Sequence, residues 1–134
     1  MVFACGEWIS IFVLRKEEAL LKENTVEEKS FDFAVRIVKL YRYLNEKKEF
    51  VLSKQLLRCG TSIGANVSEA QFGQSKADFC AKMHIALKEA NETRYWLRLL
   101  YATGFLEQKQ YKSIRNDIDE IVSLSAICKT AEQN

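Results

Sequence analysis

Residues 79–100 read FCAKMHIALKEANETRYWLRLL. Apolar or small residues recur there after four and then three positions, at Phe79, Met83, Ala86, Ala90, Thr93, Leu97 and Leu100. Residues with this spacing share one side of an α-helix, because 3.6 residues make one turn. The segment therefore predicts a long helix with a single buried stripe.

Two short signals bound this helix. Ser75, followed three residues later by Asp78, is typical of a capping box at a helix start. Gly104 is typical of the left-handed residue just beyond a helix end. We therefore expect the helix to begin after Ser75 and to end before Gly104.

The same spacing occurs in three further segments, about residues 24–46, 49–72 and 107–130. Their stripes are Val26, Ser30, Phe33, Ile37, Leu40 and Leu44; Leu52, Leu56, Cys59, Ile63, Asn66 and Ala70; and Tyr111, Ile114, Ile118, Ile121, Ser125 and Cys128. Four striped helices with short connections predict an all-α protein, an antiparallel up-down four-helix bundle. The absence of proline agrees with long helices. Polar and glycine breaks near residues 47, 73 and 104 argue against one long coiled coil.

The chain of 134 residues has room for one bundle domain, which we place at residues 22–134. Residues 1–21 are predicted to be a short N-terminal extension outside the core fold. Its apolar run VFACGEWISIFVL, at residues 2–14, is too short to span a membrane and lacks the basic start of a secretory signal. A strand, a short helix docked on the bundle, an interfacial anchor and sequence upstream of the natural start remain open for it.

Positive charge gathers on the predicted first helical hairpin. Residues 33–60 carry seven basic and two acidic side chains. No helix-turn-helix, RNP-like or zinc motif accompanies them, so any nucleic acid would be read through its backbone or shape. The residues predicted to bind it are Lys39, Arg42, Lys47, Lys48, Lys54 and Arg58.

A second band runs beside the core stripe of the third helix and contains Ile85, Glu89, Glu92, Trp96 and Leu99. Interfaces between proteins are often anchored by an aromatic residue such as tryptophan. We predict that this band is an oligomer interface, in which the two glutamates pair with basic groups of a neighbouring subunit such as Arg58. The alternative is that the band covers the flank of the monomer's own core.

Three residues of the second helix are assigned structural roles. Gly60 and Gly64 lie one turn apart, and a glycine within a helix costs about 1 kcal/mol relative to alanine. Close approach of a neighbouring backbone would offset that cost, and a bare strip that accommodates a ligand is the alternative. Asn66 falls on the core stripe, where a buried amide can fix register or oligomeric state.

Nothing in the sequence supplies catalytic chemistry. His84 is the single histidine, and Glu89-x-x-Glu92 lacks the histidine of a di-iron carboxylate bundle. The four cysteines form no C-x-x-C pair and are interpreted as reduced thiols of a cytoplasmic protein. We predict no enzyme activity, no cofactor and no metal.

Several segments resemble one known family. They are LSKQLLR at residues 52–58, TSIGANVSEA at 61–70, SKADF at 75–79 and IALKEA at 85–90, continued by residues 92–97. Over about residues 22–134 the chain resembles the bacterial four helix bundle proteins, also called 23S rRNA intervening-sequence proteins. The resemblance implies an up-down bundle that assembles into a ring-like homopentamer. It also implies similarity to the accessory protein of diversity-generating retroelements, which binds nucleic acid and a reverse transcriptase.

Two interpretations of function follow. In the first, the chain is a non-enzymatic oligomeric helical-bundle protein of this family that serves as an accessory factor binding RNA or DNA. In the second, it is a structural or adaptor module that binds another protein without nucleic acid. No membrane partner is predicted in either case.

Overall fold

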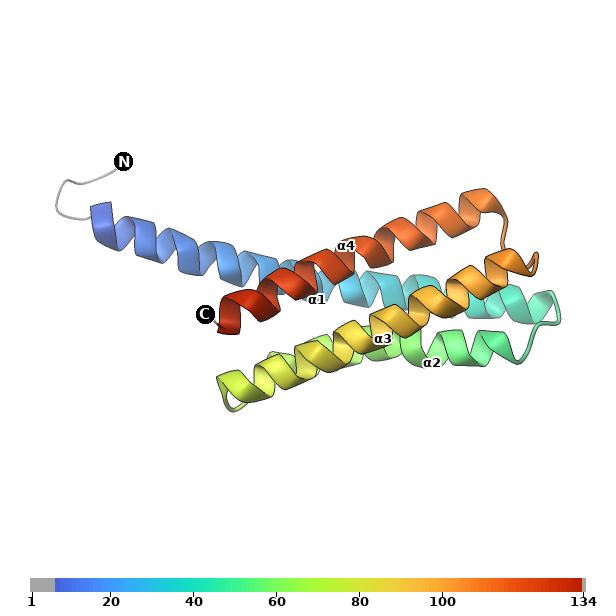
Figure 1. Cartoon of the computed structure of the whole chain (residues 1–134), viewed down its shortest axis with the longest axis horizontal. Coiled ribbons are helices and arrows are strands. Elements are labelled where there is room, and N and C mark those ends of the chain that lie inside the picture. Colours follow the sequence, from blue (N-terminus) through green and yellow to red (C-terminus); the bar gives the residue numbers. More distant parts are fainter. Residues whose placement is uncertain (1–6, 134) are drawn as a thin grey trace.

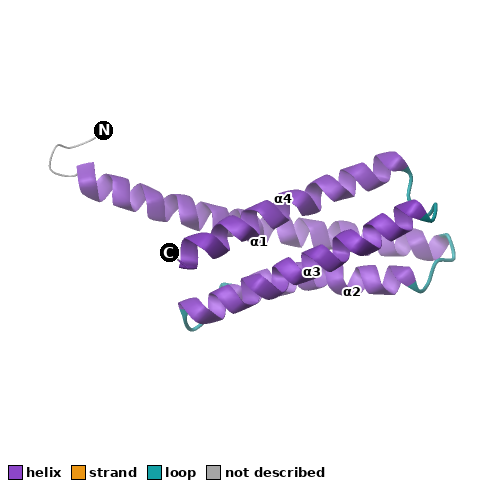
Figure 2. Cartoon of the chain, in the orientation of Figure 1, coloured by secondary structure: helices purple, strands orange, loops and turns teal. Residues whose placement is uncertain are grey.

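The computed structural model describes the backbone of residues 7–133 and the side chains of residues 25–126. Four helices follow one another along the chain: α1 (Glu7–Glu46), α2 (Leu52–Ala70), α3 (Lys76–Ala102) and α4 (Gln108–Gln133). Successive helices run in opposite directions (Figure 1), joined by short loops (Figure 2). α1 contacts α2 and α4, and α3 contacts the same two helices. The predicted all-α, up-down four-helix bundle is confirmed.

The antiparallel order places two loops together at one end of the bundle. These are residues 47–51 between α1 and α2 and residues 103–107 between α3 and α4 (Figure 1, right). We call this end the loop end. The α2–α3 turn lies at the opposite end. In the described part of the chain, no helix has an apolar segment long enough to cross a membrane.

The first helix begins far earlier than predicted, at Glu7 rather than near Asn24. Residues 7–46 contain neither proline nor glycine and are rich in leucine, glutamate and lysine, which favour the helix. The predicted start was wrong because a buried stripe marks where a helix is covered by neighbours, whereas the helix itself continues wherever nothing interrupts it. The side chains before residue 25 lie outside the described residues, so the separate status of residues 1–21 stays a prediction.

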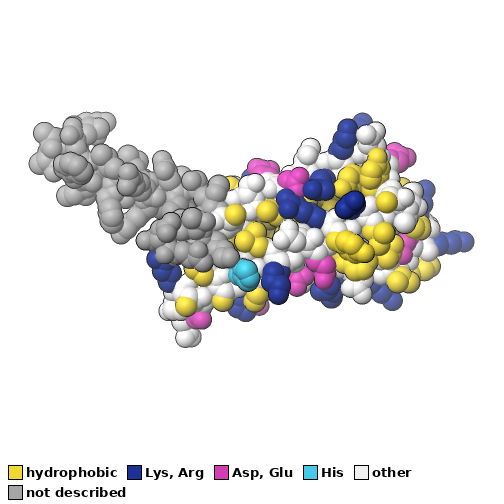
Figure 3. Space-filling model, viewed as in Figure 1, with side chains coloured by type: hydrophobic (Ala, Val, Ile, Leu, Met, Phe, Trp, Pro, Cys, Tyr) yellow, Lys and Arg dark blue, Asp and Glu magenta, His cyan; other side chains and the backbone are white. Residues whose placement is uncertain are grey.

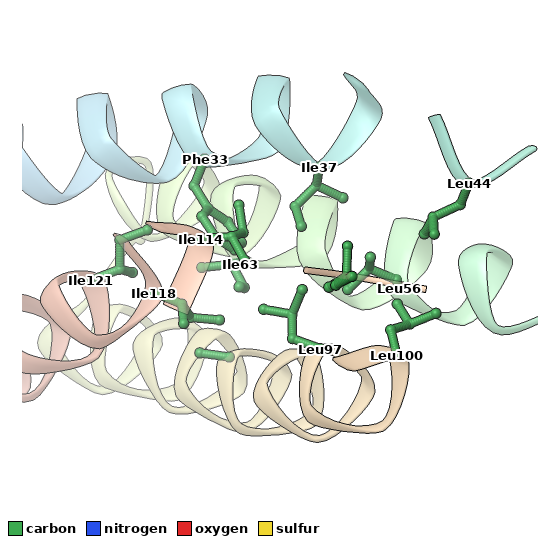
Figure 4. Packing of buried hydrophobic residues seen from close by; sticks show 12 residues of the cluster. Phe33, Ile37, Leu44, Leu56, Ile63, Leu97, Leu100, Ile114, Ile118 and Ile121 are labelled. Atoms are coloured by element: carbon green, nitrogen blue, oxygen red, sulfur yellow. The ribbon is translucent and has the colours of Figure 1, made fainter. Parts of the chain in front are cut away.

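The core is built from inward-facing residues of all four helices. All seven predicted positions of α3 are buried, as are five of the six in α1, where Leu40 is partly buried. In α4 Ile114, Ile118, Ile121 and Ser125 are buried, Tyr111 is half-buried, and Cys128 lies outside the described side chains. Figure 4 shows side chains of α1, α2, α3 and α4 pointing toward one another across the interior. Each fully buried leucine or isoleucine contributes about 1.5–3 kcal/mol, so these stripes hold the helices together.

Four of the six predicted stripe positions of α2 are buried as predicted, namely Leu56, Cys59, Ile63 and Ala70, and the prediction fails only at Leu52 and Asn66. Ser53 and Val67 are fully buried, whereas Leu52 and Asn66 are only partly buried. The Asn66 side-chain amide donates to the Ser62 carbonyl of its own helix at 2.8 Å. The placement of Asn66 in the core was wrong, because the neighbouring apolar residue enters the interior without leaving a buried amide to be satisfied.

The predicted ends of α3 are confirmed. The Ser75 hydroxyl accepts a hydrogen bond from the Asp78 backbone N–H at 3.1 Å. Gly104 has φ 88°, its N–H donates to the Tyr101 carbonyl, and the Phe105 N–H donates to the Leu100 carbonyl at 2.9 Å. This pair of bonds is the Schellman arrangement, which satisfies carbonyls at the end of a helix.

Helix α1 ends in the same arrangement without a glycine. Lys48 has φ 64°, and its N–H donates to the Asn45 carbonyl at 2.9 Å. The next N–H, of Glu49, donates to the Leu44 carbonyl at 2.9 Å. Lys48 therefore occupies the left-handed position that glycine normally fills.

Replacing Lys48 by glycine is expected to raise the free energy of unfolding by about 0.5–1 kcal/mol, because it removes a β-carbon from a left-handed backbone. Urea denaturation monitored by helicity measures the change. Lys47→Gly is the matched control, since it removes the same charge from an adjacent residue whose φ is not positive. Equal effects of the two substitutions would contradict the prediction.

The start of α2 depends on Glu49, which lies outside the apolar stripe of this helix. Glu49 is buried, and its carboxylate accepts backbone N–H bonds from Val51 at 3.1 Å, Leu52 at 2.8 Å and Ser53 at 2.6 Å. The Ser53 hydroxyl in turn donates to the Glu49 carbonyl at 2.9 Å. The helix thus begins at Leu52, and Glu49 caps it from outside instead of forming its first turn.

Candidate nucleic-acid interface

Four arginines near the middle of the bundle are compensated by carboxylates of the same chain. Arg94 and Arg115 share Asp119, at 2.6 Å and 3.0 Å. The other pairs are Arg36 with Asp117, and Arg58 with Glu92 and, at 3.6 Å, Glu89. We call the four arginines, together with the carboxylates that pair with them, the arginine girdle.

The hydrogen bonds around Asp119 favour the charged forms of both the carboxylate and its partner Arg115. Burial alone would raise the pKa of Asp119, but hydrogen bonds from Arg115 and Arg94 hold it below its usual value. The bond to Asp119 likewise raises the pKa of Arg115. Both partners therefore stay charged near neutral pH and satisfy one another.

Beyond the girdle, the loop end carries positive charge without internal compensation. Eight basic side chains there are exposed, and none forms an ion pair with a described residue. We call them the basic end: Lys39, Arg42, Lys47, Lys48, Lys54, Arg98, Lys109 and Lys112. The acidic residues of the same half are Glu46 and Glu107, which are exposed, and the buried Glu49.

The two halves of the bundle have opposite net charge. Residues 36–58 and 94–115, the half with the loop end, contain twelve basic and three acidic side chains. Residues 25–35, 59–93 and 116–126, in the other half, contain four basic and ten acidic ones. Figure 3 shows dark-blue side chains spread around the loop end. Such a separation creates a field that attracts an anion to one end of the molecule.

Five of the six residues predicted to bind nucleic acid belong to the basic end. Arg58 does not, because its guanidinium is paired with Glu89 and Glu92; its side chain is still exposed, and its role in binding stays a prediction. The pairing that we assigned to a neighbouring subunit is made within one chain. Three further members of the basic end, Arg98, Lys109 and Lys112, were not predicted from the sequence. The predicted antiparallel topology could have indicated these three residues, because it places the end of α3 and the start of α4 next to the α1–α2 loop.

Within the predicted oligomer band, Glu89 and Glu92 face α2, where they pair with Arg58. Ile85 is exposed, but Trp96 is partly buried and packs against the main core cluster. The indole N–H of Trp96 is buried without a hydrogen-bond acceptor among the described residues. Leu99 is half-buried. The band thus covers part of the monomer's core, and its role between subunits stays a prediction.

The two glycines lie where α2 crosses α1. A β-carbon on Gly60 would stand 2.9 Å from two side-chain carbons of Ile37, and one on Gly64 would stand 3.1 Å from the Ser30 carbonyl oxygen. The helices therefore approach closely at both glycines. On the outer side, Gly64 also lines a groove of about 730 Å³ between the two helices, beside the exposed Phe31.

Two of the cysteines, Cys59 and Cys80, have described side chains. Burial raises the pKa of the Cys59 thiol to about 11, so it stays protonated at neutral pH. Cys80 is half-buried. Within the side chains that the structure describes, no three His, Cys, Asp or Glu gather in a way that would hold a metal ion.

Comparisons with known proteins agree with this architecture. Residues 22–126 match the family described as 23S rRNA-intervening sequence protein. The chain is also similar to a protein with unknown function from the S23 ribosomal protein family of Bacteroides thetaiotaomicron VPI-5482, known from a crystal structure. The two are 60% identical, the match covers 81% of this chain and 98% of the other, and the TM-score is 0.79. No curated protein matches the chain. Since the family match extends over most of the bundle, the chain belongs to the 23S rRNA-intervening sequence proteins.

Proposed function

We propose that this chain is a non-enzymatic, oligomeric protein of the cytoplasm that binds nucleic acid through the basic end. The observation that carries the proposal is the set of eight exposed, uncompensated cations gathered at the loop end. A phosphate backbone presents closely spaced negative charge, and lysine and arginine bind it by releasing its counterions. The acidic character of the other half directs such a ligand to one end.

The distribution of the eight cations favours recognition of the phosphate backbone over recognition of base edges. The eight cations come from all four helices and one loop, so they surround the loop end and do not form a single recognition helix. Binding should therefore depend weakly on sequence and strongly on salt. RNA is the appropriate first probe, because the family is described by its relation to 23S rRNA intervening sequences.

Self-association is the second part of the proposal. A ring of identical subunits, as the family resemblance implies, would repeat the basic end and multiply the number of phosphate contacts. Light scattering of the wild-type protein at micromolar concentration is expected to give a mass several times that of the 15.5 kDa chain. A monomeric mass would remove the oligomer from the proposal and leave nucleic-acid binding to be judged by itself.

Reversing two charges of the basic end tests nucleic-acid binding directly. Arg42→Glu with Lys54→Glu is expected to lower the affinity for a single-stranded RNA at least tenfold at about 0.1 M salt. The slope of log affinity against log salt should fall by about 1.4, because each lost contact with a single strand accounts for about 0.7. Fluorescence anisotropy over a salt series measures both quantities.

Lys76→Glu with Lys88→Glu is the matched control. It changes the net charge by the same amount, but both lysines are exposed outside the basic end. The control should retain most of the wild-type affinity. If wild-type protein is not retained on RNA or DNA at about 50 mM salt, where phosphate contacts are strong, the nucleic-acid proposal fails. The adaptor interpretation would then replace it.

A further inference from the structure

A groove of about 440 Å³ lies between α1 and α4 near the loop end. Leu40 and Tyr43 from α1, Leu106 from the α3–α4 loop and Ile114 from α4 provide apolar surface along it. Lys39 and Lys109 also line the groove, one from each helix. It therefore combines apolar surface with two cations that form no ion pair with any residue whose side chain the structure describes.

The composition of the groove narrows the class of ligand. An inorganic anion would use the two lysines but leave the apolar surface exposed to water. A purely apolar ligand would use that surface but not the ammonium groups. A nucleotide has both parts, a flat base with two π faces and a charged phosphate, and the groove volume falls within the range of small-ligand sites.

Tyr43 is the residue best suited to meet a base. Its side chain is half-buried against the core, so the ring is held in place, yet it lines the open groove. The Lys47 ammonium lies over a face of the same ring, 5.5 Å from its centre, so a base stacking on that face would displace the ammonium toward the adjoining phosphate. A base stacked on Tyr43 would thus have a third cation nearby for the adjoining phosphate.

We infer that the α1–α4 groove receives one nucleotide of a single strand, with the base against Tyr43 and the flanking phosphates on Lys39 and Lys109. This inference rests on the proposed function and makes it more specific. In a duplex the bases are already stacked and paired, so a duplex offers the groove only phosphates. A single strand can contribute both interactions, and the protein should prefer it to a duplex of equal length.

The test uses fluorescein-labelled U16 and a 16-base-pair RNA duplex with the full-length protein. Tyr43→Leu keeps an apolar side chain but removes the stacking face, and it should weaken U16 binding roughly tenfold with little change for the duplex. Lys39→Ala with Lys109→Ala should weaken U16 binding about tenfold or more at 0.1 M salt. Lys76→Ala with Lys88→Ala is the matched control and should leave U16 binding nearly unchanged.

A measurement on wild-type protein removes any dependence on how the variants fold. U16 containing 4-thiouridine should cross-link on irradiation to the peptide that carries Tyr43, and unlabelled U16 should suppress the cross-link. The inference is overturned if U16 binds the wild-type protein but Tyr43→Leu does not weaken it, because loss from the lysine variant alone follows already from the basic end, or if the cross-link maps elsewhere. In that case the Arg42→Glu, Lys54→Glu variant would still lose affinity and the proposed function would stand. Wild-type protein that binds neither probe overturns both.

Discussion

Glu49→Ala is expected to lower the free energy of unfolding by about 3 kcal/mol. The substitution removes a buried carboxylate that accepts three backbone N–H bonds at the start of α2. Hydrogen bonds to a charged group contribute about 1.5–3 kcal/mol, and donors left without an acceptor add a desolvation cost. Thermal and urea denaturation at pH 7 measure the loss.

Glu46→Ala is the control for this experiment. Glu46 is an exposed carboxylate at the last residue of α1, just before the same loop, so its removal changes the charge equally without uncapping α2. It should change stability by no more than about 0.5 kcal/mol, as is usual for a surface substitution. Similar losses for the two alanine variants would show that the Glu49 carboxylate does not hold the helix start.

The contribution of Glu49 should depend on pH in the acid range. Burial alone would raise its pKa, but the backbone hydrogen bonds from Leu52, Ser53 and Val51 outweigh burial and lower it. Folding therefore favours the ionised form. The stabilisation is fully present above the unfolded pKa, about 4.3, and is lost as the pH falls through the lower folded pKa. The stability difference between wild type and Glu49→Gln should shrink over that window and stay constant from pH 6 to 8.

Gly60→Ala is expected to destabilise the bundle by about 1–2 kcal/mol, although alanine is the better helix former. The new β-carbon would stand 2.9 Å from both Cγ atoms of Ile37. Ile37 is fully buried and β-branched, so it has little freedom to turn away. The overlap should therefore exceed the gain of about 1 kcal/mol in helix propensity.

In a protein that also carries Ile37→Ala, the effect of Gly60→Ala on stability is expected to change sign. Ile37→Ala removes all three contacting carbons and by itself costs about 2–5 kcal/mol. In that background Gly60→Ala should stabilise by up to about 1 kcal/mol, because only the propensity difference remains. Denaturation of the four proteins of this double-mutant cycle gives the coupling energy. A Gly60→Ala effect with the same sign in both backgrounds would show that the close approach to Ile37 does not explain the glycine.

The sequence by itself determined those features that depend on local periodicity and capping. The stripe from Phe79 to Leu100, the cap at Ser75 and the left-handed Gly104 were all predicted from residues within one helix and its flanks. The up-down bundle followed from four such helices with short connections. These predictions succeeded because helix geometry relates a residue's position in the chain directly to the face on which it lies.

Tertiary structure decided whatever depends on contacts between helices. Near the end of α2, Val67 rather than Asn66 enters the interior, where it packs in one cluster with Val26 of α1 and Met83 of α3. The sequence did not predict that Glu92 of α3 pairs with Arg58 within one chain. Lys109 belongs with Lys39 only because the antiparallel topology returns the start of α4 to the loop end. The physical reason is that periodicity fixes which face a residue occupies, whereas the partner opposite that face is set by how the helices cross and in which order they surround the core.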